Sequence, residues 1–467
     1  MAGIGFHIER LLSSDTFTGS LKAYLHAGMI SSGNMLATYA CLLGLVTFSR
    51  MYLGELDLMK FQVTVTSVYC LSMLLVGPLQ MVLHRYLADV FYEQRPEKVM
   101  PCLRAALAFH AAAAIPVGMA FFSISGFEGM ELLASTLLLG LIVWIWICST
   151  FLGACKAYET ITAVFFVSLV AAFGFSHALG QLYGFAGLLS GFALGHLLLF
   201  VLLYLQLVRE FPSRHSVRFG WLAYSRRFRM LVLASALSNV GIWADKLVFW
   251  ASDGAVVVKG LLRYHPVYDP CMFIALLTAV PAYAHFLLAL ETHFYRLFKR
   301  FCHQLSQGLP FSQIARTRDR MVRTLREEVT QLAKLQALCA LFVIVAAPWI
   351  LELASLPSAY VHVLRLSAIG VALAVGVLLH VVLLLYFDLQ REAALVSGIF
   401  AVASTFFSAL TLTLGLRYYG LGYVVAGLIA LLAGAWLLDR RLSRMEFLLF
   451  RRNAMLSLTE IPEDPVP

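Results

Sequence analysis

The sequence predicts an all-α polytopic membrane protein with about twelve transmembrane helices in two six-helix lobes. Hydrophobic residues make up 61% of the 467 residues and charged residues only 13%, about half the charged share of an ordinary soluble domain. Apolar windows of about 18 to 25 residues, the length that a helix needs to cross a bilayer, recur from end to end. The strands of a membrane barrel would give shorter, alternating segments, so the spans are predicted to be helices.

The predicted spans leave two long connections on the cytoplasmic side, after the sixth and the eighth span. The first of these divides the chain into an N-lobe (24–206) and a C-lobe (230–438), joined by a basic linker (207–229). With an even number of spans in each lobe, both lobes insert in the same direction, which makes a parallel repeat. The predicted spans are 24–48, 61–83, 101–124, 131–153, 160–178, 183–206, 230–251, 271–290, 332–353, 362–386, 393–415 and 419–438.

The two ends of the chain are predicted to lie outside the bilayer. Residues 1–23 are typical of a short amphipathic helix on the membrane surface, with Ile4 and Ile8 on one side. They contain no apolar run followed by a small-residue cleavage site, so we do not expect a secretory signal. Residues 439–467 form a C-terminal tail.

Basic residues predict the orientation, because loops rich in Lys and Arg stay in the cytoplasm. Placing the N-terminus inside puts most of the 35 Lys and Arg residues on the cytoplasmic side, including those of the linker 207–229, the loop 291–331 and the tail. We therefore expect both termini in the cytoplasm. The net charge of +9 then reflects topology and attraction to anionic lipid, and no nucleic-acid partner is expected.

The sequence offers little for catalysis or for a cofactor. Its eight cysteines are scattered and have neither metal-site nor disulfide spacing. The thirteen histidines form no HExxH or Ser/His/Asp pattern. No glycine-rich phosphate loop follows a predicted strand, so ATP-driven transport by this chain is not expected. We predict no catalytic site, no metal site and no cofactor.

The segment NVGIWADKLVFW (239–250) places two charges inside the seventh predicted span. On an ideal helix Asn239, Trp243 and Lys246 share one face. Asp245 points about a third of a turn away from Lys246, because sequence neighbours do not face each other on a helix. We therefore expect the two charges not to neutralise each other locally, and each to need its own partner or water.

Two interpretations of this charged pair are open. Charges within a span usually face a bundle interior or an aqueous cavity, which predicts that Asp245 and Lys246 line a substrate path. Asn239 and Trp243 are predicted to bind substrate beside them. Alternatively, Lys246 lies close enough to the outer end of its span for its stem to snorkel to the interface, and Asp245 forms a structural ion pair.

The first predicted span carries a polar stripe without charges. Ser31, Asn34, Thr38 and Cys41 fall on one face of this helix. The stripe predicts contact with a polar substrate, or else close helix packing in which small residues and hydroxyls join neighbouring helices. Both interpretations are compatible with the sequence.

The outer loop after the seventh span reads ASDGAVVVKGLLRYHPVYDP and carries Tyr264 and Tyr268. Aromatic and polar groups at a pore mouth suit a sugar, because its ring faces stack on aromatic rings and its hydroxyls need donors and acceptors. Tyrosine is also common at membrane interfaces in general. We predict Tyr264 and Tyr268 as substrate-binding residues, with the interfacial role as the alternative.

The inside segment 291–336 begins as a basic amphipathic stretch, in which Phe294, Phe298 and Phe301 face one way and Arg296 and Lys299 face others. The pattern predicts a segment that lies on anionic lipid. A docking surface for a cytoplasmic partner is the alternative.

Three segments carry a resemblance to a known family: MAGIGFHIERLL at the N-terminus, NVGIWADKLVFW, and HPVYDPCMFIALLTAVPAYAHFLLALETHFY. They closely resemble the PelG family, the inner-membrane transporters of Pel exopolysaccharide systems. This family lies within the multidrug/oligosaccharidyl-lipid/polysaccharide (MOP) exporter superfamily. The resemblance covers essentially the whole chain, although residues 31–34 read SSGN where relatives often have Gly-Pro.

The resemblance implies a two-lobed, MOP flippase-like transporter that moves a galactosamine-containing exopolysaccharide across the bacterial inner membrane during biofilm formation. It also implies two partners, a cytoplasmic glycosyltransferase and a membrane-bound subunit that senses cyclic di-GMP. It supplies no set of substrate-binding residues to carry over.

Two other functions are compatible with the residues themselves. A cation-coupled drug exporter of the same superfamily needs a titratable carboxylate in its cavity, and Asp245 is the main acidic candidate deep in a span. A polytopic membrane transferase would need a convergent pair of His or carboxylate side chains in a membrane groove, and no such pattern is evident. The exopolysaccharide transporter is therefore the preferred prediction.

Overall fold

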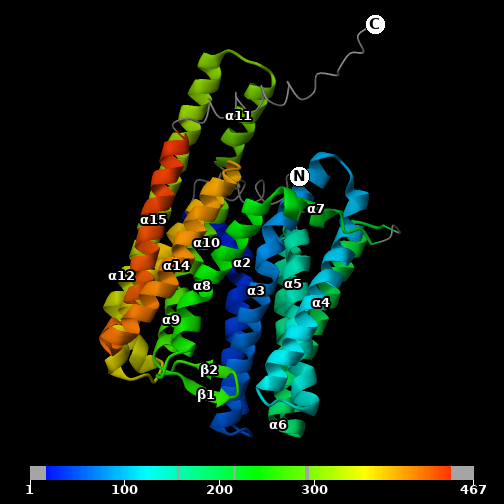
Figure 1. Cartoon of the computed structure of the whole chain (residues 1–467), viewed down its shortest axis with the longest axis vertical. Coiled ribbons are helices and arrows are strands. Elements are labelled where there is room, and N and C mark those ends of the chain that lie inside the picture. The colour runs from blue at the N-terminus through cyan, green and yellow to red at the C-terminus, as the bar shows by residue number, and fades with distance from the viewer. Residues whose placement is uncertain (1–16, 155–157, 214–216, 290–293, 443–467) are drawn as a thin grey trace.

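The computed structural model describes residues 17–154, 158–213, 217–289 and 294–442. Within them the chain forms long helices and one short β-hairpin (Figure 1). Eleven of these helical segments are long and apolar enough to cross a membrane. The longest, α6 (Tyr158–Glu210), has non-helical backbone at Gly184, so it comprises two spans. Every predicted span therefore falls on a helical segment.

The spanning helices surround two separate hydrophobic cores. One core joins the helices of the N-lobe and includes Phe61, Leu103 and Ile147. The helices around it are α2 (Phe17–Ser49), α3 (Glu55–Tyr92), α4 (Val99–Ile124), α5 (Gly129–Ala154) and α6. The limits of the two lobes stay a prediction, because the cores mark the interior of each lobe and not its ends.

The second core lies in the C-lobe and includes Met321, Val371 and Phe400. The helices that surround it are α8 (Arg229–Trp250), α9 (Tyr268–Leu276), α10 (Ala279–Leu288), α12 (Phe311–Leu353), α13 (Val361–Tyr386), α14 (Gln390–Leu414) and α15 (Leu421–Leu442). The shorter elements are α7 (Gly220–Arg227), α11 (Tyr295–Ser306), β1 (Val256–Lys259), β2 (Leu262–Tyr264), η1 (Pro96–Lys98), η3 (Ser358–Tyr360) and η4 (Leu416–Tyr418).

Glycines bring the two arms of α6 together. Gly184 adopts a positive φ of 61°, which turns the chain back on itself. Beyond the turn, Gly191 and Gly195 lie against the first arm. A Cβ atom on Gly191 would lie 2.4 Å from the Cα atom of Ser176, and one on Gly195 would lie 2.1 Å from the Cβ atom of Ala172. Small residues at this spacing let helix backbones approach closely in a membrane.

The two lobes meet where α3 packs against α8 and where α2 packs against α10. The hydroxyl of Ser235 in α8 donates a hydrogen bond to the carbonyl oxygen of Gly77 in α3. A Cβ atom on Gly77 would lie only 2.7 Å from the Nδ2 atom of Asn239. At the other contact, the rings of Tyr39 and Phe273 lie 4.4 Å apart.

The inside segment 291–331, predicted as a loop, is largely helical. It contains α11 and the first half of α12, a 43-residue helix of about 65 Å. Both project from the molecule at the end opposite the β-hairpin (Figure 1). The side chains of Phe294 and Phe301 are 1% exposed within the C-lobe core. The predicted lipid-facing role is therefore wrong, because the protein itself covers the apolar side of this segment.

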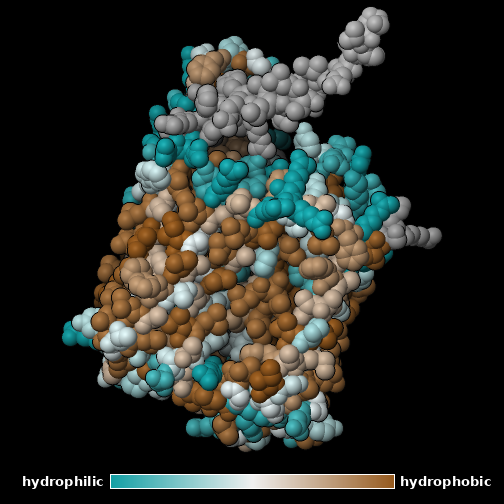
Figure 2. Space-filling view, viewed as in Figure 1, coloured by the Kyte–Doolittle hydropathy of each residue, from teal (hydrophilic) through white to brown (hydrophobic). Residues whose placement is uncertain are grey.

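The surface has the character of a membrane protein. Figure 2 shows a broad hydrophobic band around the middle of one face, with hydrophilic residues gathered at the end where α7 and α11 lie. The predicted amphipathic segment 1–23 falls mostly outside the described residues, as does most of the tail 439–467.

Candidate functional site

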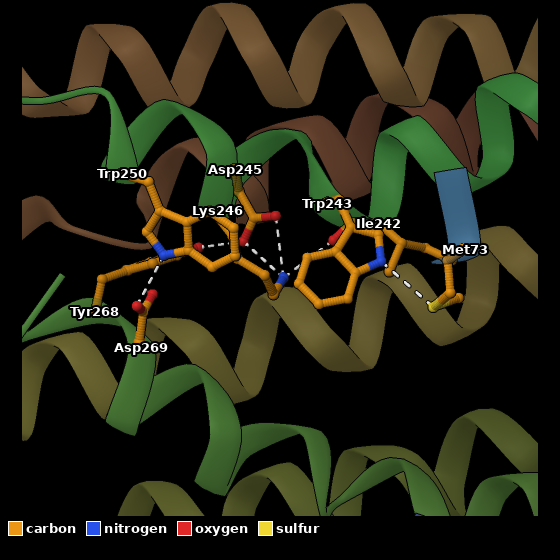
Figure 3. Close-up of polar contacts among 8 residues, drawn as sticks. All are labelled: Met73, Ile242, Trp243, Asp245, Lys246, Trp250, Tyr268 and Asp269. Carbon is orange, nitrogen blue, oxygen red and sulfur yellow. Dashed lines mark hydrogen bonds and ion pairs between the residues drawn. The ribbon is translucent and has the colours of Figure 1, made fainter. Parts of the chain in front are cut away.

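Asp245 and Lys246 form an ion pair near the end of α8 (Figure 3). The Nζ atom of Lys246 lies 3.1 Å from both carboxylate oxygens of Asp245 and donates a hydrogen bond of 3.0 Å to the carbonyl oxygen of Ile242. The prediction that the two charges do not meet is wrong. A helical wheel fixes only the direction of each Cβ atom, whereas the flexible four-carbon stem of lysine swings the ammonium sideways to its neighbour.

The ion pair is removed from solvent. The side chain of Asp245 is 0% exposed and that of Lys246 is 9% exposed. Tyr268 donates a hydrogen bond of 2.6 Å from its hydroxyl to the Oδ2 atom of Asp245. The ammonium of Lys246 also lies 5.4 Å from the ring centre of Tyr423 and 5.8 Å from that of Trp243. These contacts replace water around both charges, which a buried pair requires.

A second carboxylate joins the end of α8 to the start of α9. Asp269 accepts hydrogen bonds from the indole nitrogen of Trp250 at 2.8 Å and from the backbone nitrogen of His265 at 2.9 Å. It lies in the first turn of α9, where a negative charge is favourable. The ring of Tyr268 stacks on that of Phe249 at 3.8 Å. The cluster is therefore built where two helices and their connecting loop are tied together.

The same cluster touches the opposite lobe. The indole nitrogen of Trp243 lies 3.4 Å from the Sδ atom of Met73 in α3, as Figure 3 shows. Asn239 lies on the same helix, 9% exposed, and packs against Gly77 of α3. Its Nδ2 atom donates a hydrogen bond of 2.9 Å to the carbonyl oxygen of Ser235. Asn239 and Trp243 thus lie at the interface between the lobes.

The polar stripe of α2 is separate from this cluster. Thr38 donates a hydrogen bond of 2.8 Å to the carbonyl oxygen of Asn34, and Ser31 lies 3.4 Å from that of Gly28. These partners belong to α2 itself. The Oδ1 atom of Asn34 is buried and accepts no hydrogen bond from the residues that the structure describes. An acceptor within the N-lobe therefore stays available.

The two tyrosines predicted together lie in different places. Tyr268 is fully buried beside Asp245, whereas Tyr264 lies in β2 and packs, half-buried, against the N-lobe core. Burial raises the pKa of Tyr264. His265 lies between the two tyrosines in sequence, and burial lowers its pKa to about 4. The Nδ1 atom of this neutral imidazole accepts a hydrogen bond of 3.1 Å from the backbone nitrogen of Tyr268.

The sequence matches one protein family over almost its whole length. Residues 1–450 match the family model described as "PelG: Putative exopolysaccharide Exporter (EPS-E)". The chain belongs to the PelG family. As a PelG-family member it is an exopolysaccharide exporter, and hence a transporter and not an enzyme. No curated protein matches the sequence.

Solved structures show that the PelG-family chain has the fold of MATE transporters in the MOP superfamily. An outward-facing MATE multidrug transporter matches with a TM-score of 0.61 at 14% identity, over 91% of this chain and 96% of that one. An inward-facing MATE transporter gives 0.60 at 13% identity, over 88% and 95%. A MOP transporter from Pyrococcus furiosus Vc1 gives 0.60 at 14% identity, over 90% and 94%. The predicted all-α polytopic fold is confirmed.

Several residues that surround Asp245 and Lys246 could not be predicted from sequence patterns. Met73 and Tyr423 lie far from α8 in sequence, and no local pattern points to them. The contact of Asp269 with His265 could have been predicted, because the two residues are four positions apart in the segment HPVYDP, about one helical turn. In the N-lobe, the hydroxyl of Tyr69 lies 3.3 Å from the Nε2 atom of His196, a contact between two helices that no spacing predicts.

Proposed function

We propose that this exporter carries a galactosamine-containing exopolysaccharide across the bacterial inner membrane along a path between its two lobes. Membership of the PelG family supports the polysaccharide as substrate. The main observation in support of this path is the buried Asp245–Lys246 ion pair. It lies about one helical turn from Trp243, where α8 contacts α3 of the other lobe.

The chemistry of the cluster suits an amino sugar. The Asp245 carboxylate already binds a primary ammonium at 3.1 Å and a hydroxyl at 2.6 Å, and ammonium and hydroxyl are the two kinds of hydrogen-bond donor in galactosamine. Trp243 and Trp250, with ring centres 6.1 Å apart, offer faces on which a sugar ring stacks. When the lobes separate along α3 and α8, an ammonium of the polymer replaces that of Lys246 at Asp245.

The path requires a second conformation. In this one the cluster is closed, since Asp245 is fully buried and Asn239 is 9% exposed. Transporters of this architecture work by rocking one bundle against the other. A polymer must also leave as readily as it binds, and the return of Lys246 to Asp245 supplies the competing cation that releases it.

We propose the α2 stripe as a second contact for the substrate. The unpartnered Oδ1 atom of Asn34 accepts a hydrogen bond from a sugar hydroxyl, with Ser31 and Thr38 beside it. Tyr264 contributes where the path leaves the protein. These residues act in sequence along the polymer and not as one closed pocket.

We propose that both termini and the α11–α12 projection face the cytoplasm, because basic residues favour that side of the membrane. The β1–β2 hairpin, at the opposite end of the molecule, then faces the periplasm. Most of the cations of the projection lie on its surface, including Arg316, Arg320 and Arg323.

The proposed function predicts a specific loss of secretion. In a bacterium that makes the polymer with this chain, deleting the gene abolishes secreted galactosamine polysaccharide, because the hydrophobic bilayer bars a charged polymer. The measurement is hexosamine analysis of culture supernatant and cell lysate. The wild-type gene on a plasmid restores secretion. Full secretion from the deletion strain contradicts the proposal.

The α11–α12 projection predicts contact with a cytoplasmic partner. We propose that its exposed cations bind the glycosyltransferase, with the cyclic di-GMP-sensing subunit beside it in the membrane. Changing Arg316, Arg320 and Arg323 to Gln is expected to reduce co-purification of the glycosyltransferase at least fivefold, since each exposed ion pair contributes up to about 1 kcal/mol.

The matched control for this experiment is Arg417→Gln, which removes an exposed cation at the other end of the molecule and leaves co-purification unchanged. Equal recovery of the glycosyltransferase with the triple variant and with the wild type would contradict the proposal that these cations bind it.

A further inference from the structure

The β1–β2 hairpin belongs to the C-lobe by connection and to the N-lobe by packing. It joins α8 to α9, both in the C-lobe. The side chain of Leu262 is nevertheless 0% exposed and is part of the N-lobe core. Val258 and Tyr264 pack against that same core, and both strands contact α3. The hairpin therefore reaches from one lobe to the other.

The tip of the hairpin is fitted closely to the turn between α4 and α5. Gly260 has a φ of +56°, and a Cβ atom on it would lie 2.4 Å from the Cα atom of Ser125. The Nζ atom of Lys259 lies 3.2 Å from the Oε2 atom of Glu131 and 4.8 Å from the ring centre of Phe127. Backbone, charge and aromatic contacts thus converge on one small area of the N-lobe.

The base of the hairpin is held just as firmly in the C-lobe. The backbone nitrogen of His265 donates a hydrogen bond to Asp269, which also accepts one from Trp250. The imidazole of His265 packs edge-on against the rings of Phe249 and Tyr419, with centre distances of 5.1 and 5.4 Å, and those two rings also contact each other. Because the hairpin is attached to both lobes, the lobes cannot separate at this end while it keeps both sets of contacts.

We propose that the hairpin, residues 256–264, is a latch that closes this end of the transporter and must release the N-lobe before this end opens. Its release exposes the α3–α8 interface and the Asp245 cluster behind it. Lys259, Gly260 and Leu262 stabilise the closed state and do not contact the substrate. The meaning of this opening as substrate release rests on the proposed function, whereas the latch itself rests on the contacts alone.

The test uses Cys70 as a reporter of opening. This native cysteine lies in α3, is 2% exposed, and precedes by about one helical turn Met73, which contacts Trp243 of α8. With the other native cysteines replaced, the full chain is expressed in cells, and spheroplasts are treated with a membrane-impermeant maleimide. The rate of Cys70 labelling then measures how often the latched end opens, with no need for polymer or partners.

Two changes separate the tip from the N-lobe. Gly260→Val drives a side chain into the backbone of Ser125, and Leu262→Ser removes the buried apolar contact. Each is expected to raise the labelling rate of Cys70 about tenfold or more, because the latch equilibrium shifts toward the open state. The control is Val257→Ser on the same hairpin, where the side chain is 54% exposed, and it labels at the wild-type rate.

A charge exchange tests the ion pair independently of packing. Lys259→Glu and Glu131→Lys are each expected to raise labelling up to about fivefold, the range of a partly exposed pair. The double variant Lys259→Glu/Glu131→Lys returns the rate toward that of the wild type. If Gly260→Val lowers the amount of folded transporter, these charge variants still test the proposed latch.

The outcomes are distinct. Wild-type labelling rates in Leu262→Ser and in both single charge variants, with normal amounts of protein, overturn the latch. Faster labelling confined to inverted membrane vesicles supports the latch but contradicts the proposed orientation. Faster labelling in spheroplasts supports both, whatever the secretion assay of the deletion strain shows.

Discussion

Asp245→Ala is expected to remove most of the folded transporter from the membrane. The change leaves the buried ammonium of Lys246 without its carboxylate and the hydroxyl of Tyr268 without its acceptor. Breaking one side of a buried ion pair costs about 3 to 5 kcal/mol, a large part of the total stability of about 5 to 15 kcal/mol of a typical protein. The measurement is membrane abundance by immunoblot, with thermal unfolding of whatever protein is recovered in detergent.

Replacing the whole cluster with apolar side chains is expected to restore the protein. In Asp245→Leu/Lys246→Met/Tyr268→Phe no charge or hydroxyl is left unpaired, and such replacements of buried pairs are often neutral or stabilising. The control for Asp245→Ala is Asp253→Ala, which removes an exposed carboxylate just beyond α8. Wild-type abundance of Asp245→Ala contradicts the buried pair, because only a hydrated Lys246 tolerates the loss of its partner.

Gly191→Ala is the second change with a large expected effect. Its new Cβ atom would meet backbone atoms of Phe175 and Ser176 at 2.4 Å, and backbone cannot step aside as a flexible side chain can. Overpacking of this kind costs about 3 kcal/mol, and the two arms of α6 must move apart. The measurement is the midpoint of thermal unfolding in detergent.

Gly174→Ala supplies the matched control, because it lies in the same helix with no atom within 4 Å of the new Cβ. Alanine is favoured over glycine within a helix by about 1 kcal/mol, so this variant is expected to unfold at a slightly higher temperature. Equal midpoints for the two variants mean that the arms of α6 are not packed as described.

Span positions were predictable from the sequence, because the bilayer imposes a length and a polarity on every crossing helix. Even the division of α6 was found, since the predicted spans 160–178 and 183–206 lie on either side of Gly184. The close approach of Gly191 to the first arm of α6 could not be predicted, because a pattern of small residues does not tell which helix packs beside it.

The site was harder to predict for two physical reasons. Helical periodicity places Cβ atoms, so it separated Asp245 from Lys246, which the long lysine side chain brings together. The position of Tyr268 within the C-lobe and of Tyr264 against the N-lobe depends on how a short hairpin crosses between lobes. Such contacts join residues far apart in sequence, and hydropathy carries no information about them.

The segment 291–336 shows the same limit of prediction from the sequence. The amphipathic pattern around Phe294 and Phe301 predicted that one side is covered, and it is. Periodicity alone could not tell whether lipid or protein covers it. The long extension of α12 beyond the bilayer, with Ile314 and Met321 buried, provides a protein surface that competes successfully with lipid.

The central claim is that the Asp245–Lys246–Tyr268 cluster serves export and is not merely a structural ion pair. The most direct test is the amount of polysaccharide secreted per folded transporter by Asp245→Leu/Lys246→Met/Tyr268→Phe, a variant expected to be as abundant as the wild type. Because the variant lacks the carboxylate that we propose as the binding site of the polymer's ammonium, its secretion is expected to fall by about tenfold, equivalent to about 1.4 kcal/mol. Wild-type secretion per folded transporter would contradict the claim and leave the cluster with a purely structural role.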